Sequence, residues 1–437
     1  MTTAIGGESA ANPPENQPHM PPGSPADTGA AAPRTLAQGG RDRLLTTIRA
    51  VSMMMVVLTH VAFSNVKPNA TGIEPVADAL PVDIFSWLIA WVAAFFATGG
   101  ALSRHSGKTP LLRWWARRGP RLVAPYYVFI AIIIPIEFVL AYYEPLGICA
   151  DFGIKQVVAH AVPPPAECTG MLGGPLWFLF VYVPLALFSP WLVKIYDSRL
   201  RIIAPAVAIG ALLVLDLSVA SGTIGQAATL GSSAFSAANA LAYLAHLFLF
   251  WGLIYYAGFF YADGYLDNLG RKALYLALAF AALCAVMVLA GPWPGQVFGA
   301  WHRGGNQFPP TLAWGAAFLA WMFLLIWLRN PIEMLALRKI PGKIVDWFAN
   351  RSLTILIWHM TAFTLLYWFV RSIGFLPTLD GLPVGVSRLI WTILVFAVTV
   401  PVVDLFYPVE RWSDRAGKAL ERRYVSYKSK RNAPAQP

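Results

Sequence analysis

Long apolar runs dominate the chain between residues 44 and 407, and short polar segments separate them. Each run is about 20 residues long, which is the length that an α-helix needs to cross the hydrocarbon core of a bilayer. The pattern predicts ten transmembrane helices. The seven runs after the third can be regrouped by one, so a total of nine or eleven helices is also compatible with the sequence. The ten runs are 44–66, 80–102, 121–142, 173–195, 201–221, 241–262, 271–290, 311–329, 352–373 and 385–407.

The lysines and arginines predict how these helices are oriented. Most of the 33 basic residues fall in alternate connecting segments, and cytoplasmic loops of membrane proteins carry this excess. The alternation requires an even number of spans. We therefore expect an all-α polytopic protein of the plasma or inner membrane, a bundle of about ten transmembrane helices with both termini cytoplasmic. The net charge of +11 then reports topology, and no nucleic-acid partner is expected.

The two ends of the chain differ in composition from the apolar region between them. Residues 1–40 are rich in proline, glycine, alanine and serine, which predicts a disordered cytoplasmic tail because such a segment buries too little apolar surface to fold. Residues 411–437 are basic and are expected to form a cytoplasmic tail that can lie along anionic headgroups. Residues 41–410 form the expected membrane domain.

Arg49 and His60 lie inside the first apolar run, eleven positions apart. Eleven helical steps of about 100° return to nearly the same azimuth, so both side chains project from one helix face, about 16 Å apart along the axis. Ionisable groups in a membrane span are costly and are functional candidates by default. Alone, the histidine can be a structural partner and the arginine can reach the headgroups. As a pair, they indicate a cationic anchor near the cytoplasm and a deeper imidazole that accepts a proton near neutral pH.

An arginine-rich segment precedes the third run. It is either an ordinary positively charged cytoplasmic loop or a phosphate-binding patch, since the guanidinium fork suits phosphate oxygens. Its arginines are Arg113, Arg117, Arg118 and Arg121.

Other motifs have a structural interpretation beside a functional one. Phe95-Phe96 and Gly99-Gly100 in the second run favour close helix packing, and Trp177 starts the fourth run, where tryptophan ordinarily anchors the membrane interface. Ser352 and His359 lie seven positions apart in the ninth run. Four further ionisable residues inside apolar runs indicate a polar interior of the bundle: Glu137, Asp216, His246 and Asp404.

The three cysteines give little evidence of metal chemistry. Cys149 and Cys168 share one predicted outer loop, where a disulfide and two free thiols are equally compatible with the sequence. Cys284 lies within an apolar run and is expected to pack there. No cluster of cysteine and histidine has the spacing of metal ligands, so no metal site is expected.

Together these motifs resemble the integral-membrane acyltransferase family 3, which includes bacterial O-antigen and peptidoglycan O-acetylases and macrolide O-acyltransferases. The resemblance covers roughly residues 40–410, and its most specific part is an arginine, ten residues and a histidine in the first span. The matching residues are Arg49, His60, Phe95, Phe96, Gly100, Arg117, Arg118, Arg121, Pro125, Tyr126, Leu176, Trp177, Phe178, Leu179, Ser352 and His359.

Two positions depart from the family pattern. Many members carry an aspartate two residues before the Phe-Phe pair and a serine before the glycine, whereas this chain has Ala93 and Gly99. Because subfamilies vary at both positions, the departure bears on the substrate more than on the reaction.

The resemblance implies that an acyl group, usually acetyl, moves from acyl-coenzyme A to a hydroxyl group. The implied acceptor is an envelope glycan, a glycolipid or a secreted metabolite such as a macrolide. His60 and Arg49 are the expected catalytic residues, with His60 as general base or as transient acyl carrier. The arginines of the segment before the third run would bind the donor, which is a substrate, and no permanently bound cofactor is expected. The implied donor residues are Arg117, Arg118 and Arg121, and the implied secondary site residues are Trp177, Ser352 and His359.

Two other functions fit parts of the sequence. Buried histidine, aspartate and glutamate would also serve a proton-coupled transporter or a flippase, although no repeat relates the two halves of the chain. A third interpretation is a non-catalytic scaffold in an envelope complex. Binding of acyl-coenzyme A separates the enzyme from both alternatives.

Overall fold

The structure is a computed structural model, and it describes most of the chain from residue 42 onward. The predicted tail 1–40 and the loop that holds Cys149 and Cys168 lie outside the described residues. The described residues are 42–62, 64–66, 73–75, 86–88, 91–143, 176–223, 237–297, 305–307, 309–375, 379 and 381–431.

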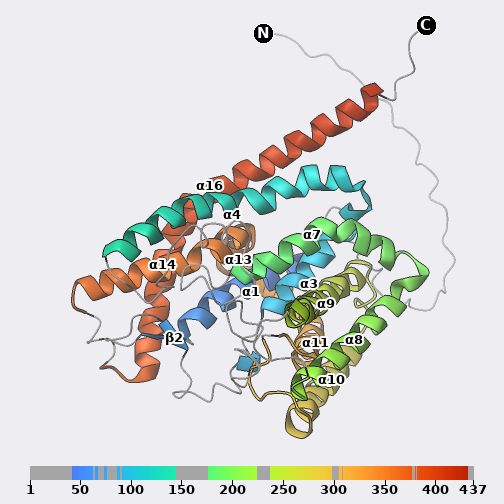
Figure 1. Cartoon of the computed structure of the whole chain (residues 1–437), viewed down its shortest axis with the longest axis horizontal. Coiled ribbons are helices and arrows are strands. Elements are labelled where there is room, and N and C mark those ends of the chain that lie inside the picture. Colours follow the sequence, from blue (N-terminus) through green and yellow to red (C-terminus); the bar gives the residue numbers. More distant parts are fainter. Residues whose placement is uncertain are drawn as a thin grey trace, which may run out of the picture. The chain divides into compact units, whose positions relative to one another are not determined.

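Helices make up nearly all of the described structure (Figure 1). A short antiparallel pair of strands, β1 (Ser64–Val66) and β2 (Ile73–Pro75), follows the first helix. The short 3₁₀ helices are η2 (Ser106–Lys108) and η4 (Arg199–Arg201). The α-helices are α1 (Arg43–Ala62), α3 (Val92–Ser103), α4 (Leu111–Tyr143), α7 (Trp177–Tyr196), α8 (Ile203–Ala220), α9 (Ala237–Ala262), α10 (Arg271–Ala290), α11 (Leu312–Trp327), α12 (Arg329–Leu337), α13 (Lys339–Asn350), α14 (Ser352–Ser372) and α16 (Val384–Arg431).

The helices identify a multi-pass membrane protein. Among the described residues, seven helices are long and apolar enough to cross a membrane, and up to eight if α11 and α12, which meet at a 65° bend, form one span. The ten predicted runs each overlap a helix, and the all-helical class is confirmed. The number ten and the cytoplasmic position of both termini stay predictions.

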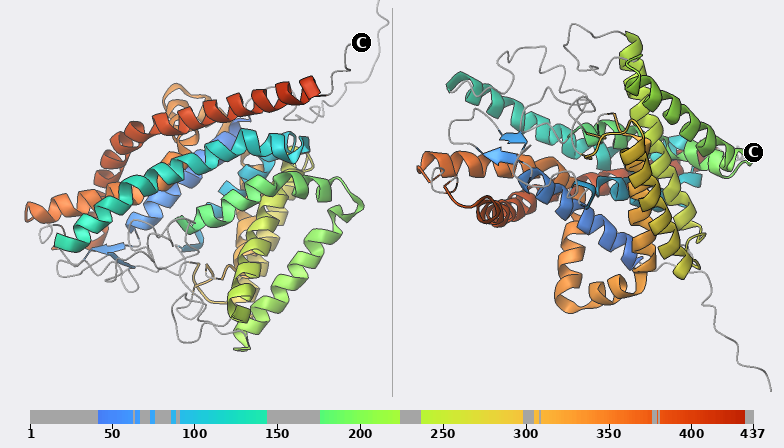
Figure 2. Two further views of the ribbon diagram at one scale, coloured as in Figure 1. Left: turned by 45° about the horizontal axis from the view of Figure 1, so that its top comes forward. Right: turned by 90° about the horizontal axis from the view of Figure 1, so that it is seen from below.

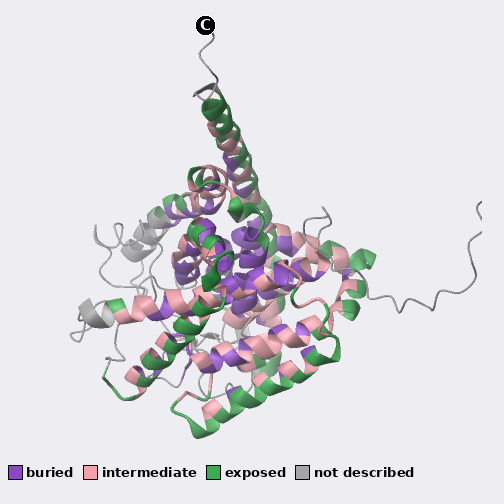
Figure 3. Cartoon of the chain, turned by 90° about the vertical axis from the view of Figure 1, so that its right-hand side faces the viewer, coloured by how far each residue is buried: buried purple, intermediate pink, exposed green. Residues whose placement is uncertain are grey.

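Many residues of α1, α3, α9 and α14 are buried, whereas α8 and α10 leave most of their apolar side chains exposed. Figure 3 shows the buried positions gathered toward the middle of the described helices. In each of α8 and α10, only 17% of the apolar stretch that could cross a membrane is buried. An apolar helix with so little protein contact suits a position in lipid, where the hydrocarbon chains solvate its side chains. The pairs α4 with α16, α3 with α9, and α10 with α11 pack along their lengths (Figure 2).

A charged clamp ties together the ends of α3, α7 and α9. The Arg104 guanidinium is buried and lies 2.6 Å from an oxygen of Asp197 and 3.0 Å from an oxygen of Asp263. Burial lowers the pKa of Arg104, but hydrogen bonds with the two carboxylates raise it by more, so the net pKa lies above its ordinary value. The arginine therefore stays charged, and the clamp is an ion-paired network.

A second buried cluster confirms part of the predicted polar interior. The Asp216 carboxylate accepts hydrogen bonds from His246 Nε2 at 2.7 Å, Trp293 Nε1 at 2.7 Å and the Leu312 backbone N–H at 3.0 Å. Asp216 is fully buried, so these donors replace the water that the carboxylate loses. The cluster joins α8, α9 and the start of α11.

The close packing of α3 on α9 depends on glycine. A Cβ atom at Gly100 would overlap the carbonyl oxygen of Tyr255, and one at Gly258 would overlap the carbonyl oxygen of Ala97. Both obstacles are backbone atoms, which no side-chain rotation can move. The predicted role of Gly99-Gly100 in close helix approach is confirmed at Gly100.

We expect Gly100→Ala to destabilise the protein by at least about 3 kcal/mol, because α3 and α9 must separate to admit the methyl group. Thermal unfolding in detergent measures the effect. Gly252→Ala on α9 is the matched control, since a Cβ there would lie at an ordinary 3.7 Å from Leu185. Equal stability of the two variants would show that the α3–α9 contact is more adaptable than its geometry indicates.

The last helix is longer than its apolar run. α16 continues from the predicted tenth span through the basic segment to Arg431. Its second half packs antiparallel against the start of α4, where Arg113 lies 2.7 Å from Glu421 and Arg121 lies 3.9 Å from Asp414. The predicted boundary between residues 410 and 411 therefore falls inside this helix. The cytoplasmic location of the segment stays a prediction.

Candidate active site

Two polar contacts join α1 to α14. His359 Nε2 lies 3.2 Å from His60 Nδ1, and Arg49 Nε donates a hydrogen bond to Ser352 Oγ at 2.7 Å. These four residues carry the two-residue motifs of the first and ninth apolar runs. The structure therefore brings together residues that lie about 300 positions apart in the sequence.

His60 and Arg49 of α1 both face α14, as a shared helix face predicts. His60 and Arg49 are separated by about 16 Å along α1, whereas Ser352 and His359 are separated by about 10 Å along α14. The two contacts mark the ends of one interface. Ser352 and His359 are fully buried, and Arg49 and His60 are half-buried.

The hydrogen bonds of the two histidines define their neutral tautomers. His359 Nδ1 lies 2.9 Å from the carbonyl oxygen of Ile355 and 3.0 Å from that of Leu356. Carbonyl oxygens only accept, so Nδ1 of His359 carries the hydrogen and Nε2 accepts. His60 Nδ1 lies between the carbonyl oxygen of Val56, at 2.8 Å, and His359 Nε2. It therefore carries its own hydrogen, and the lone pair of His60 is on Nε2.

A cationic cluster surrounds the other end of the interface. Arg49 lies over the Phe95 ring, 5.7 Å from its centroid. Arg118 and Arg121 of α4 are within electrostatic reach of Arg49, and so is the carboxylate of Glu410. Three guanidinium groups face the carboxylates of Glu410 and of Asp414, which lies 3.9 Å from Arg121. The remaining excess of positive charge is suited to a ligand with several negative charges.

The arginine-rich segment is not the loop that the charge pattern suggested. Its residues form the first turns of α4, which begins at Leu111 and continues through Pro120 and Pro125. Buried Trp114 anchors these turns by donating from Nε1 to the carbonyl oxygen of Ala186 at 2.8 Å. A high density of charge did not prevent a helix here, because one face of the segment has apolar packing partners.

The predicted donor-binding arginines are spaced along the helix α4 so that they face different neighbouring parts of the bundle. Arg117 lies 3.9 Å from Glu421 of α16, on the side that Arg113 also faces. Arg118 stacks over Trp114 at 4.9 Å and is within electrostatic reach of Tyr182 and Tyr255. The structure therefore groups Arg118 with Arg49 and places Arg117 toward α16. Arg121 lies between the two, within electrostatic reach of Arg49 and 3.9 Å from Asp414 of α16.

Trp177 lies inside the bundle. Its side chain is 7% exposed, and its ring packs 5.6 Å from Trp251 and 6.3 Å from Phe178. Trp251 stacks in turn on Phe96 at 4.4 Å. Trp177 therefore packs among core aromatics that also support the Phe95-Phe96 motif, and its depth relative to a membrane stays a prediction.

Glu410 is a candidate site residue that the sequence pattern did not identify. Its buried carboxylate oxygen Oε2 accepts from Thr354 Oγ1 at 2.6 Å and from the Thr354 backbone N–H at 3.3 Å. Thr354 lies in the first turn of α14, where backbone N–H groups have no partner within the helix. Glu410 thus caps the helix beside Ser352, the partner of Arg49. A carboxylate just after the last apolar run was the available signal.

We expect Glu410→Ala to destabilise the protein by about 1–3 kcal/mol, because it leaves buried donors of Thr354 without their acceptor. Glu410→Gln is expected to lose less than half as much, since one amide oxygen can accept both hydrogen bonds. Thermal unfolding is again the measurement. Asp404→Ala is the control, because the Asp404 carboxylate pairs with Arg351 from a half-exposed position. Equal loss in the alanine and glutamine variants would show that the charge matters, not the hydrogen bonds.

Tyr182 explains one departure from the family pattern. A Cβ atom at Gly99 would lie 2.8 Å from Tyr182 Cε2 and from its hydroxyl oxygen. Tyr182 also stacks on Phe178 at 5.3 Å, which restricts its movement. A serine before Gly100 therefore does not fit beside this tyrosine, and the glycine is a consequence of the local packing.

Within the described part of the chain, no group of three or more histidine, cysteine, aspartate or glutamate side chains is placed to hold a metal ion. The polar groups at the α1–α14 interface are instead imidazole, guanidinium and hydroxyl. These groups suit proton transfer and anion binding.

The fold and the site together define a multi-pass membrane protein with a histidine pair and an arginine cluster along one helix interface. The sequence model of the acyltransferase domain family matches residues 44–408. The chain therefore belongs to acyltransferase family 3. Comparisons with curated proteins and with solved structures give no match.

Proposed function

We propose that the protein is an O-acyltransferase that moves an acyl group, most often acetyl, from cytoplasmic acyl-coenzyme A to a hydroxyl group. The acceptor is an envelope glycan, a glycolipid or a secreted metabolite. The observation that carries the proposal is the α1–α14 interface, which has a hydrogen-bonded histidine pair at one end and converging arginines at the other.

His60 is the general base of the proposed reaction. Its Nε2 lone pair takes the proton of the acceptor hydroxyl while the oxygen attacks the thioester carbonyl carbon. The imidazolium that forms donates from Nδ1 to the Val56 carbonyl oxygen and His359 Nε2, which lie at 2.8 and 3.2 Å. The carbon–sulfur bond then breaks, and the coenzyme A thiolate takes the proton from Nε2. In the alternative sequence, His60 attacks the thioester first and carries the acyl group.

His359 acts as a positioning residue in this scheme. Its Nδ1–H is fixed by the Ile355 and Leu356 carbonyl oxygens, so its Nε2 faces His60 as an acceptor. This arrangement favours the His60 tautomer with the lone pair on Nε2. It also stabilises the protonated form of His60 without placing a second full charge in the bundle.

The arginine cluster is the proposed binding site for the donor phosphates. Arg49, Arg118 and Arg121 supply guanidinium groups for the phosphate oxygens, and the phosphopantetheine arm runs from them along the interface. Arg49 and His60 are about 16 Å apart along α1, so a donor whose phosphates bind at the cationic end places its thioester at the histidine pair.

The test is release of coenzyme A from acetyl-coenzyme A by the purified protein in detergent. Wild type and His60→Ala are compared with and without a crude envelope extract as acceptor. Release that requires both the extract and His60 supports the proposal. No release from several acyl donors by a folded protein would overturn it and favour the proton-coupled transporter, for which buried histidines are also suited.

A further inference from the structure

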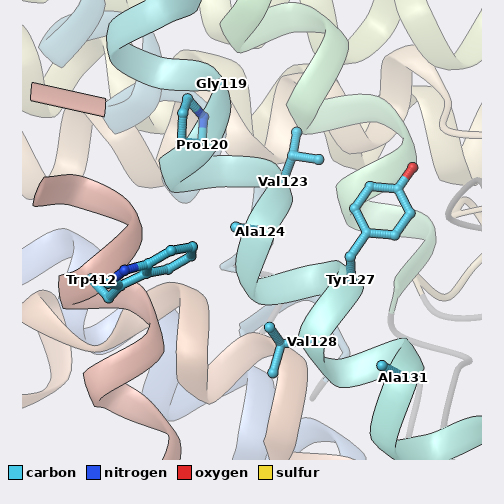
Figure 4. A pocket seen from close by; sticks show the side chains of 8 residues that line it. All are labelled: Gly119, Pro120, Val123, Ala124, Tyr127, Val128, Ala131 and Trp412. Carbon is cyan, nitrogen blue, oxygen red and sulfur yellow. The ribbon is translucent and has the colours of Figure 1, made fainter. Parts of the chain in front are cut away.

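An apolar groove lies along the outer face of α4, beside α16 (Figure 4). Its volume is about 630 Å³, and the small residues of α4 provide the space. The indole of Trp412 forms one wall, and Tyr127 lies on the other side of α4 in this view. The lining residues are Gly119, Pro120, Val123, Ala124, Tyr127, Val128, Ala131 and Trp412.

The groove is separate from the histidine site because α4 lies between them. Phe129 on the inner face of α4 packs 5.0 Å from Trp358, the residue before His359. The groove residues recur every three or four positions and therefore share the opposite face. Tyr127 is 49% exposed and Trp412 is 58% exposed, so this face is turned away from the bundle.

Exposed tryptophans mark the depth of the groove. Trp115 of α4, Trp191 of α7 and Trp412 of α16 are all exposed large aromatics. Indole rings at a lipid-facing surface favour the headgroup level of a bilayer. From Pro120 to Ala131 the groove extends for about 16 Å along α4. A bilayer with these indoles at its headgroup level would therefore place the start of the groove at that level and the rest of it in the hydrocarbon of one leaflet.

Positive charge lies at the headgroup end of the groove. Because α4 and α16 are antiparallel, with Asp414 facing Arg121 and Glu421 facing Arg113, the residues of α16 beyond Trp412 run past the start of the groove. Arg415 is one turn beyond Trp412 on a similar azimuth and is exposed. Two further exposed basic residues follow in the same helix, Arg422 and Arg423, whereas Lys418 lies 2.6 Å from Asp414.

We propose that this groove binds an anionic phospholipid, with one acyl chain along α4 and the phosphate beside Arg415. The apolar lining matches the chain, and the exposed guanidinium matches the headgroup charge. The site does not depend on the proposed acyltransferase reaction, because its test measures lipid contact and no turnover.

The test uses the full-length protein in nanodiscs of phosphatidylcholine with added lipids whose acyl chains are brominated, which quench tryptophan fluorescence on contact. The Trp412 signal is the difference between wild type and Trp412→Phe. Half-maximal quenching is expected at about fivefold less brominated phosphatidylglycerol than brominated phosphatidylcholine, the factor that one arginine at an anionic surface provides. Ala124→Phe, which fills the groove, is expected to abolish the preference.

Matched variants separate a site from general lipid contact. The signal of Trp191, obtained from Trp191→Phe, is expected to show no preference between the two lipids, since this exposed tryptophan does not line the groove. Arg415→Gln is expected to remove the preference at Trp412, and Arg199→Gln, at another exposed arginine, to leave it unchanged. Equal quenching of Trp412 by both lipids, or a preference that survives Arg415→Gln and Ala124→Phe, would overturn the proposal.

Discussion

Acyl transfer is expected to fall by about 10²- to 10⁴-fold when His60 is replaced by alanine, the range that a positioned general base contributes. The loss should appear in kcat, because in the proposed reaction His60 acts on the acceptor hydroxyl, at the end of the interface opposite the arginine cluster. The measurement is the initial rate of coenzyme A release at saturating acetyl-coenzyme A. The matched control is His105→Ala, since His105 is an exposed histidine and should leave the rate unchanged.

The histidine pair makes a second test possible. His359→Ala removes one of the two acceptors for His60 Nδ1–H and leaves the Val56 carbonyl oxygen, so we expect a smaller loss of about 10- to 100-fold and a changed pH–rate profile. Adding His359→Ala to His60→Ala should cost little more, because residues that act as a unit are not additive. An activity loss in the double variant equal to the product of the single losses would show that the two histidines act independently.

Helical periodicity specifies two faces of the site. The spacing of Arg49 and His60 fixes their shared face on α1, and the spacing of Ser352 and His359 does the same on α14, because helix geometry is local. It does not encode which helices meet. The contact between Arg49 and Ser352 joins residues 303 positions apart, and only the family resemblance assigned both motifs to one site before the structure was known.

The errors in the sequence interpretation have a common origin. Charge density suggested that residues 111–121 form a loop, and a tryptophan at the start of an apolar run suggested that Trp177 anchors a membrane interface, but tertiary packing decides both positions. Trp114 and Trp177 are buried against neighbouring helices, which no property of their own segments specifies. Glu410 was missed for the same reason: its importance depends on Thr354 of another helix.

In the described fold, the arginines of α4 have two different roles, which the sequence alone does not distinguish. Arg113 is engaged by Glu421 at 2.7 Å and joins α4 to α16. Arg118 instead adds to the charge around Arg49, and Arg121 does so while lying 3.9 Å from Asp414. The excess charge costs stability in the unliganded protein, and a polyanionic donor would relieve the repulsion. This difference predicts that neighbouring arginines of one helix have very different effects on donor binding.

Arg49→Ala is accordingly expected to raise the KM for acetyl-coenzyme A by about 10- to 150-fold, which corresponds to one charge-assisted hydrogen bond of about 1.5–3 kcal/mol. Arg118→Ala should act in the same direction. Arg49→Lys should recover only part of the loss, because an ammonium keeps the charge but cannot form the guanidinium fork. Initial rates over a range of donor concentrations, at two salt concentrations, provide the measurement.

Arg113→Ala is the control for this experiment, since its guanidinium is held by Glu421, and its KM should stay within about threefold of wild type. The wild-type KM should rise with salt, because screening weakens the attraction between donor phosphates and the cluster. An Arg113 variant as impaired as the Arg49 variant would place the donor over the α4–α16 contact instead. In that case the acceptor would bind along the α1–α14 interface between the levels of Arg49 and His60, and the thioester would have to reach His60 from the α4 side.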